Sequence, residues 1–182
     1  NWKTIPLETM DSRTDWVVIL TDDAEAYFLE INAIVTRMKH PKTCFVIDLH
    51  PCANYKHLQE QWDNYVMTDK ESVEVLLSFI HHHLVNHSMI SFAIQDFREL
   101  GVPYPFIRAT SAEIGKKVPM DSHANAICYG LSFEYGSDHT TSYMTTFNEA
   151  LDDIDKDTPV LWSIQNSTDD VVEAIFFHEC KF

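Results

Sequence analysis

The chain has 182 residues, of which 45% are apolar and 23% charged, and its formal net charge is −15. This composition is typical of one globular domain with a sizeable core, and no apolar run is long enough for a membrane-spanning helix. The 13 lysines and arginines are thinly spread, which disfavours nucleic acid as a partner. The acidic surface is expected foremost to be a solvated one, and it also suits a protein with a basic surface or metal cations.

The first part of the chain is predicted to alternate strands and helices. Residues 1–15 are polar and irregular, and the apolar run WVVIL predicts a strand at 16–20. Asp22 and Glu25 form a capping-box pair at the start of a predicted helix. The run TCFVIDL then predicts a second buried strand at 43–49. This order favours a parallel pair of strands with a right-handed crossover.

Two helices, a strand and a long loop are expected next. After Cys52, the apolar residues of YKHLQEQWDNYV recur at helical spacing and predict one helix. The capping box TDKE predicts a second helix that reaches Leu84. The alternation in MISFAIQDF predicts a strand at 89–97. Residues 98–122 contain several prolines and glycines and are predicted to form mostly a long loop, with room for a short strand at 105–109. Long loops of this kind are often functional.

The last third is predicted to be rich in strands. The segment SHANAICYGLSFEYG predicts a long strand in which Gly130 marks a bulge. A helix at 141–154 and two strands at 159–165 and 170–182 follow. The predicted order is β-α-β-α-α-β-loop-β-α-β-β. It indicates a single-domain α/β sandwich with a mixed, partly parallel sheet over residues 1–182.

Cys52 is a candidate nucleophile, because the positive end of the predicted helix that it opens lowers a thiol's pKa. His123 begins the long strand and Asp138 follows that strand, so the chain offers a base and a carboxylate to orient it. The run HANAICYG resembles the histidine strand of papain-like cysteine hydrolases. The resemblance implies a cysteine hydrolase or acyl transferase that uses Cys52, His123 and Asp138. The alternative is that Cys52 is only a small residue at a helix start.

A second candidate is a group of acidic residues that end apolar runs: Asp22, Asp48 with His50 close behind it, and Asp96. Ligands of α/β sheets bind outside the carboxyl ends of parallel strands, so these side chains are expected to converge if their strands are neighbours. Carboxylates with an imidazole suit Mg²⁺ or Mn²⁺, and the group then predicts a divalent-metal phosphoesterase. The alternative for Asp22 is a role as helix cap.

The run HHHLVNH is a third candidate, because His83 and His87 are four residues apart and share one face of a helix. A third metal ligand would have to come from elsewhere in the chain. The alternative is that these histidines interact with the negative end of the helix dipole.

Other motifs of catalysis are missing. The four glycines form no phosphate-binding loop and no G-x-S-x-G motif, and the four cysteines lack the spacing of a zinc site or a disulfide scaffold. No secretory signal is recognisable. We therefore expect a soluble, intracellular protein that needs no cofactor, with Mg²⁺ or Mn²⁺ as the alternative.

Tyr104 and Phe106 lie in the predicted loop, where aromatic side chains either dock a partner or hold the loop against its own core. Because the enzyme motifs are poor, the sequence favours an acidic protein-binding domain of accessory, effector or inhibitor type. Its partner is expected to be another protein, docked through residues 98–122. The cysteine hydrolase and the metal phosphoesterase are the alternatives.

Overall fold

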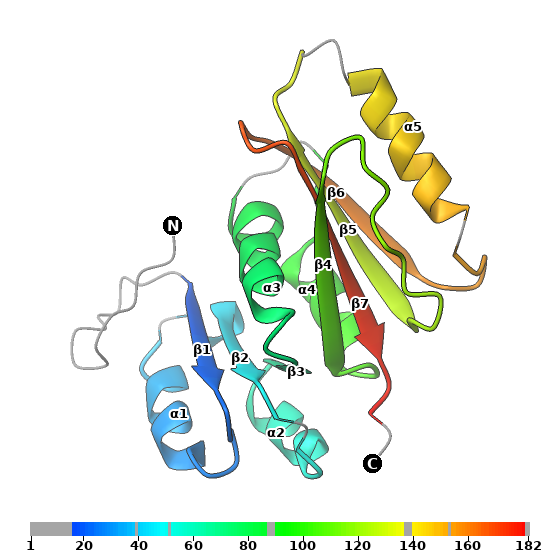
Figure 1. Cartoon of the computed structure of the whole chain (residues 1–182). Helices are drawn as coiled ribbons and strands as arrows, with labels where there is room; N and C mark the ends of the chain where they lie inside the picture. The colour runs from blue at the N-terminus through cyan, green and yellow to red at the C-terminus, as the bar shows by residue number, and fades with distance from the viewer. Residues whose placement is uncertain are drawn as a thin grey trace.

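The computed structural model of the chain describes residues 16–38, 40–50, 52–86, 90–136, 140–152 and 154–180. Within these residues, seven strands form one sheet in the order β1-β2-β3-β4-β7-β5-β6. Four neighbouring pairs are parallel, and the two pairs that involve β7 are antiparallel. The molecule is a single α/β domain with a mixed, mostly parallel sheet and helices around it (Figure 1), which confirms the predicted fold class.

The N-terminal half supplies three parallel strands. In chain order, it contains β1 (Val17–Thr21), α1 (Phe28–Val35), a short 3-10 turn (Pro41–Thr43), β2 (Cys44–Asp48), α2 (Tyr55–Gln61) and β3 (Asn64–Thr68). The strands pair in register, from Val17 opposite Cys44 to Asp48 opposite Met67. Their carboxyl ends therefore lie at the same edge of the sheet.

The C-terminal half adds four strands to the same sheet. It contains α3 (Val73–Phe79), a π-helical turn η3 (Ile80–Val85), α4 (Ile94–Gly101), β4 (Phe106–Glu113), β5 (Ala126–Phe133), α5 (Thr140–Leu151), β6 (Val160–Asn166) and β7 (Val171–His178). Strand β7 lies between β4 and β5 and is antiparallel to both. The last strand of the chain thus occupies the middle of the sheet (Figure 1).

The core has two layers, because successive side chains of a strand point to opposite faces of the sheet. On one face, α1 and α2 pack against β1–β3, and α5 packs against β5, β6 and β7. On the other face, α3, η3 and α4 cover the middle of the sheet. Strand β5 divides accordingly: Tyr129 and Phe133 face α5, whereas Ala126 and Cys128 face α3.

The strand predicted at 89–97 and the loop predicted at 98–122 are wrong in part. Only Ile90 forms a bridge, to Ile164 of β6, and helix α4 begins at Ile94. The carboxylate of Asp96 accepts the N–H of Ala93 at 2.6 Å, which satisfies a donor at the start of the helix. The predicted loop contains the end of α4 and the eight residues of β4.

The segment NYVMT forms strand β3 and not the end of a helix, as its spacing had suggested. All five of its residues are buried between β2 and β4. Asn64 donates from its side chain to the carbonyl oxygens of Lys42 and Cys44, at 2.6 and 3.1 Å. These bonds satisfy a buried amide only in the strand arrangement.

The predicted capping boxes differ from the observed helix starts. Helix α1 begins at Phe28, well after Asp22, and its start has no side-chain cap. Before α3, the carboxylate of Asp69 accepts the N–H of Ser72 at 2.8 Å, but α3 itself begins at Val73 without a side-chain cap.

Gly130 lies in regular strand pairing and does not mark a bulge. It pairs with Ser163 of β6 on one side and with Glu173 of β7 on the other, inside unbroken registers. These three positions form one row across the sheet, on the face that α3 and η3 cover.

No helix in the described part of the chain has the length and apolar character needed to cross a membrane.

Candidate functional site

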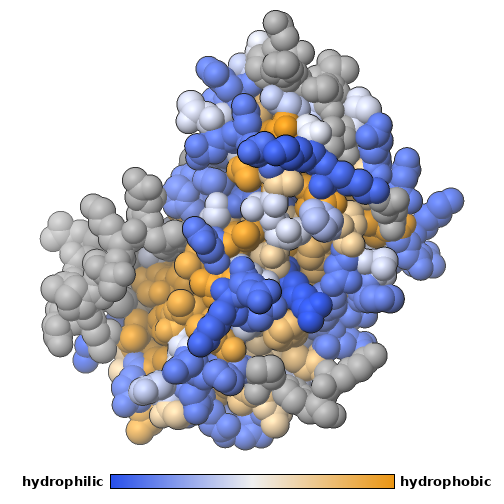
Figure 2. All heavy atoms as spheres, in the orientation of Figure 1, coloured by the Kyte–Doolittle hydropathy of each residue, from blue (hydrophilic) through white to orange (hydrophobic). Residues whose placement is uncertain are grey.

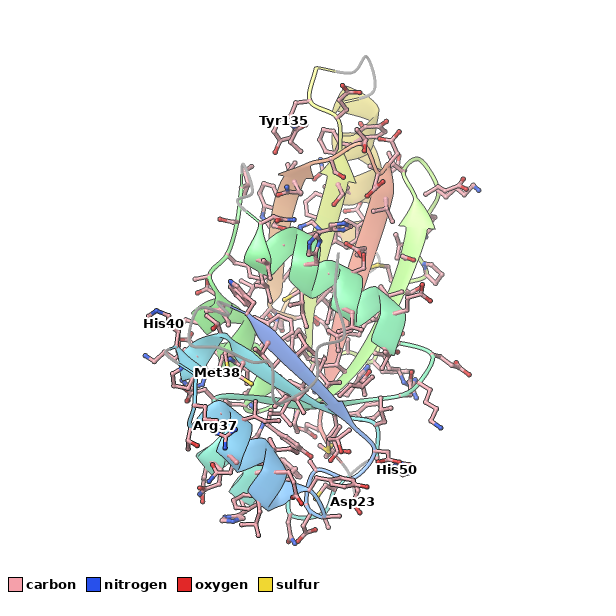
Figure 3. The ribbon with its side chains drawn as sticks, turned by 90° about the vertical axis from the view of Figure 1, so that its left-hand side faces the viewer. Asp23, Arg37, Met38, His40, His50 and Tyr135 are labelled. Carbon is pink, nitrogen blue, oxygen red and sulfur yellow. The ribbon has the colours of Figure 1, made fainter. Side chains whose placement is uncertain are left out.

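The carboxyl ends of β1 and β2 border an open, acidic cavity of about 590 Å³. It is lined by Asp22, Asp23, Glu25, Ala26, Tyr27, Asp48, His50, Cys52 and Ala53. Figure 3 labels Asp23 and His50 at this end of the molecule and Tyr135 at the opposite end. The structure therefore brings Asp22, Asp48 and His50 to one place, as parallel neighbouring strands require.

Asp48 is the most deeply buried residue of this cavity, with 1% of its surface exposed. Its carboxylate accepts three hydrogen bonds: from the N–H of Ala24 (3.2 Å), the N–H of His50 (3.1 Å) and the hydroxyl of Tyr65 (3.0 Å). Burial, followed by the Asp48 charge and its hydrogen bond, raises the pKa of Tyr65. Asp48 thus organises the loops around the cavity, because it satisfies buried donors on three segments.

The backbone donors before α1 are also occupied by side chains of this loop. Asp23 Oδ1 accepts the N–H of Ala26 at 2.9 Å, and Thr21 Oγ1 accepts the N–H of Asp23 at 3.1 Å. Backbone N–H groups at such a position bind phosphate in many α/β proteins. Here carboxylates of the chain take that place.

Asp96 does not belong to the cavity, because its carboxylate is bonded to the N–H of Ala93 at the start of α4. Within the described residues, Asp22, Asp48, His50 and Asp96 do not form a group with the mutual spacing of metal ligands. The predicted convergence therefore holds for three of the four side chains, and the metal site predicted from them lacks its fourth member.

Cys52 lies in the loop before α2, at the rim of the cavity. Its N–H donates to Met67 Sδ at 3.3 Å, and its thiol donates to Glu25 Oε2 at 3.8 Å. Burial raises the pKa of the thiol, and the charges of Glu25 and Asp48 raise it further, against a lowering contact with the Asn54 backbone. The prediction of a lowered pKa at Cys52 is therefore wrong, because burial, together with the nearby carboxylates, outweighs the contact with the Asn54 backbone.

We expect Cys52 to alkylate slowly at neutral pH, with a rate that rises only as pH approaches the raised pKa of its thiol. Glu25→Gln removes one of the causes and is expected to increase the rate at pH 7 several-fold, because more thiolate is then present. The measurement is iodoacetamide labelling followed by peptide mass spectrometry. Glu60→Gln, at an exposed glutamate of α2, is the matched control. A fast reaction of the unaltered protein at pH 7 would contradict this expectation.

Among the described residues, His123 makes no recorded contact with Cys52. The N–H of His123 donates to Asp121 Oδ1 at 2.9 Å, and the imidazole of His178 lies nearby, 3.3 Å from Asp121 Oδ2. The partners described for Cys52 are Glu25, Asn54 and Met67. Asp138 lies outside the described residues.

Tyr104 and Phe106 are half-buried and pack against their own domain. Tyr104 contacts the core beneath α3 and α4, and Phe106 contacts the core beneath α1 and α2. Phe106 is also the first residue of β4, opposite Met67 of β3. These contacts hold the segment of Tyr104 and Phe106 against the core of the domain and explain the positions of both side chains.

A second cluster of ionisable side chains lies on the opposite face of the sheet, beneath η3. Glu173 of β7 is 1% exposed, and its Oε2 lies 3.2 Å from His82 Nδ1 and 3.3 Å from His83 Nε2. Burial alone would raise the pKa of Glu173, but its hydrogen bonds with His82 and His83 lower it to about 2. Burial lowers the pKa of His83, whereas the hydrogen bond to Glu173 raises that of His82.

The predicted histidine site was incomplete. The run HHHLVNH pointed to His83, but the proposed second ligand, His87, lies outside the described residues. Glu173 was missed because it is 91 positions away from His82. The available signal was a single acid at an inward-facing position of the otherwise apolar strand VVEAIFFH.

Comparisons with known proteins identify the fold. No family model and no curated protein matches the sequence. Among solved structures, CetZ from Methanosaeta thermophila has a TM-score of 0.57 at 11% identity, over 92% of this chain and 62% of that chain. An empty FtsZ dimer from M. jannaschii has a TM-score of 0.56 at 11% identity, over 91% of this chain and 64% of that chain. The chain has a tubulin/FtsZ-like fold. It spans less than two thirds of the length of these structures.

The tubulin-like fold corrects the function predicted from the sequence. Its neighbours CetZ and FtsZ point to a tubulin-like fold rather than to an acidic binding domain. The interpretation as an acidic accessory, effector or inhibitor domain that docks through residues 98–122 is therefore wrong. That interpretation was based on composition and on missing catalytic motifs. Neither of these indicates the order of the strands in a sheet.

Proposed function

We propose that this chain is a self-associating subunit of a protein assembly of the tubulin-like kind. The observation that carries the proposal is the match of 91% of the chain to FtsZ in a dimer, with a TM-score of 0.56. A fold alone does not determine a function, so the proposal also needs a surface suited to association.

Strand β1 offers such a surface at one edge of the sheet. It pairs with β2, and no other described strand pairs with its second side. Its residues are apolar but only half-buried, and Leu20 is 46% exposed. Figure 2 shows apolar side chains gathered on this side of the molecule. An apolar strand with a free edge is a template for pairing with another chain.

A guanine nucleotide is the ligand that the tubulin-like fold implies, and the strand-end cavity does not fit its phosphates. The cavity presents four carboxylates, from Asp22, Asp23, Glu25 and Asp48, and no lysine or arginine of the described residues lines it. The N–H groups of Ala24 and Ala26 are already bonded to Asp48 and Asp23. A phosphate placed there would meet like charges and find these donors occupied. We therefore derive no nucleotide-dependent step from this cavity.

The test is sedimentation velocity of the chain from low to high micromolar concentration, with and without GTP and Mg²⁺. We expect the mean sedimentation coefficient to rise with protein concentration, equally in both conditions. Leu20→Lys should reduce this rise, because a lysine on an edge strand opposes strand pairing. Val102→Lys is the matched control, since Val102 is 49% exposed and lies after α4.

Two results would overturn the proposal. A protein that stays monomeric at every concentration excludes self-association, and equal association of the Leu20→Lys and Val102→Lys variants excludes the β1 edge as the contact. Association that occurs only with GTP would show that the nucleotide acts at a site other than the one described above.

A further inference from the structure

We propose that His82, His83 and Glu173 bind a zinc ion that links the π-helical turn η3 to strand β7. One ligand atom from each residue lies within 4.8 Å of the other two, and the three form the sole such group among the described residues. Two imidazoles and one carboxylate are a known donor set for Zn²⁺. This inference is independent of the proposed assembly.

Two of the three distances between ligand atoms match those of a tetrahedral zinc site, and the third, between the two histidine nitrogens, is within 4.8 Å. Bonds of about 2.0 to 2.1 Å from zinc to nitrogen and oxygen place neighbouring ligand atoms about 3.3 to 3.4 Å apart. Glu173 Oε2 lies 3.2 Å from His82 Nδ1 and 3.3 Å from His83 Nε2. After a small shift of the side chains, the zinc ion fits between these three atoms. It then replaces the protons of the hydrogen bonds that join them without metal.

The second nitrogen of each imidazole faces a polar group: that of His83 is hydrogen-bonded, and that of His82 lies at ion-pair distance from a carboxylate. His83 Nδ1 lies 2.5 Å from Ser163 Oγ, and His82 Nε2 lies 3.9 Å from Asp169 Oδ2. With their protons on these nitrogens, both histidines direct a lone pair toward Glu173. Such outer partners are characteristic of metal-bound histidines.

The backbone is shaped around the buried histidine. The ring of His83 lies directly over Gly130, where a Cβ atom would overlap Nε2. Gly130 stands in the sheet between Ser163 and Glu173, so the glycine leaves the space in which the ring reaches both partners. The N–H of Asn86 bonds to the carbonyl of His81, five residues earlier, at 3.3 Å. This wider turn brings two consecutive histidines to the sheet, and π-helical turns are frequent at functional sites.

Burial indicates a structural role for the ion. The side chains of His83 and Glu173 are 0% and 2% exposed, and His82, at 17%, provides the route to solvent past Asp169. The line Ser163, His83, Glu173 has the residue types of a hydrolase triad, but its serine is fully buried. A substrate cannot reach it. The hydroxyls of Ser78, 3.4 Å from His82 Nδ1, and Ser132, 3.5 Å from His83 Nε2, border the fourth position of the ion.

The test uses the untagged, full chain, because a polyhistidine tag would itself bind metal. Metal-free protein is dialysed against Zn²⁺, and bound zinc is counted by inductively coupled plasma mass spectrometry. We expect one zinc ion per chain, a higher melting temperature with Zn²⁺ than with chelator, and no effect of Mg²⁺ or Ca²⁺, which need more oxygen ligands. Co²⁺ in place of zinc should give the intense visible absorption of a tetrahedral site.

Variants separate this site from binding by exposed histidines. Glu173→Gln and His82→Gln are expected to weaken zinc binding about 100-fold or more, and Asp169→Asn, which alters a positioning residue, about 10-fold. His81→Gln, one residue earlier in η3, should bind like the unaltered protein. The melting temperature of each variant in chelator shows whether it folds.

Zinc binding by the unaltered protein tests the proposal even if a variant does not fold. The proposal is overturned if the protein does not bind one zinc ion per chain or if its cobalt spectrum is octahedral. His82, His83 and Glu173 then form only a network of hydrogen bonds. Unchanged binding by a folded Glu173→Gln variant, or loss of binding in His81→Gln, would overturn it equally.

Discussion

Replacing Gly130 with alanine is expected to lower the free energy of unfolding by about 3 to 5 kcal/mol. The new Cβ would overlap Nε2 of His83 and lie 2.6 and 2.8 Å from its Cδ2 and Cε1 atoms. The ring cannot turn aside cheaply, because it is fully buried, packs 4.8 Å from Phe79 between ring centroids and bonds to Ser163. Moving it also separates His83 from the buried Glu173 carboxylate, and a buried charge that loses a partner is costly.

The measurement is urea unfolding followed by circular dichroism, with chelator present so that bound metal does not contribute. Gly101→Ala is the matched control. A Cβ at Gly101 would meet Val66 at an ordinary 3.6 Å, and alanine favours the helix in which this residue lies, so stability should be unchanged or about 0.5 to 1 kcal/mol higher. Equal stability of the two variants would show that His83 moves freely, contrary to the packing described here.

Replacing Asp48 with alanine is expected to cost about 3 kcal/mol or more. The carboxylate accepts bonds from the N–H groups of Ala24 and His50 and from the hydroxyl of Tyr65. Ala24 and Tyr65 are 0% and 2% exposed, so water cannot replace the lost acceptor without a rearrangement of the loops. Buried donors without partners carry the full cost of their desolvation.

Asp22→Ala is the control for this prediction. Asp22 lines the same cavity but is exposed, and its removal also relieves repulsion among the carboxylates, so the change in stability should stay within about 0.5 kcal/mol. Asp48→Asn keeps one accepting oxygen, so its loss of stability is expected to lie between those of Asp22→Ala and Asp48→Ala. Chemical denaturation of the three variants side by side checks this order. An Asp48→Ala protein as stable as Asp22→Ala would contradict the role assigned to Asp48.

Local periodicity was sufficient to predict the α/β class and several elements of the core. Alternation along AICYGLSF separated Tyr129 and Phe133, which face α5, from Cys128, which faces α3. Helical spacing likewise predicted that Phe147 and Ala150 of α5 face the core. These elements are predictable because the period of side chains along a strand or helix follows from its backbone geometry.

Short segments with two compatible patterns were decided by their neighbours. NYVMT fits the end of a helix by spacing, yet β2 and β4 provide partners on both sides and make it a strand. The alternation in MISFAIQDF extends into the first four residues of α4, yet a bond from the Ala93 N–H to Asp96 begins a helix there. Tertiary context outweighs propensity in such segments, because the free-energy differences between local conformations are small.

The sequence by itself determined the composition of the core, the class of the fold and three residues that line the acidic strand ends, Asp22, Asp48 and His50. Only the tertiary structure decided that β7 enters the middle of the sheet and carries Glu173 beneath two histidines 90 and 91 positions earlier. It also decided that Gly130 makes room for one of those rings. The reason is physical: periodicity reports which face a side chain occupies, whereas the contacts of a buried polar group depend on the order and register of strands far apart in the chain.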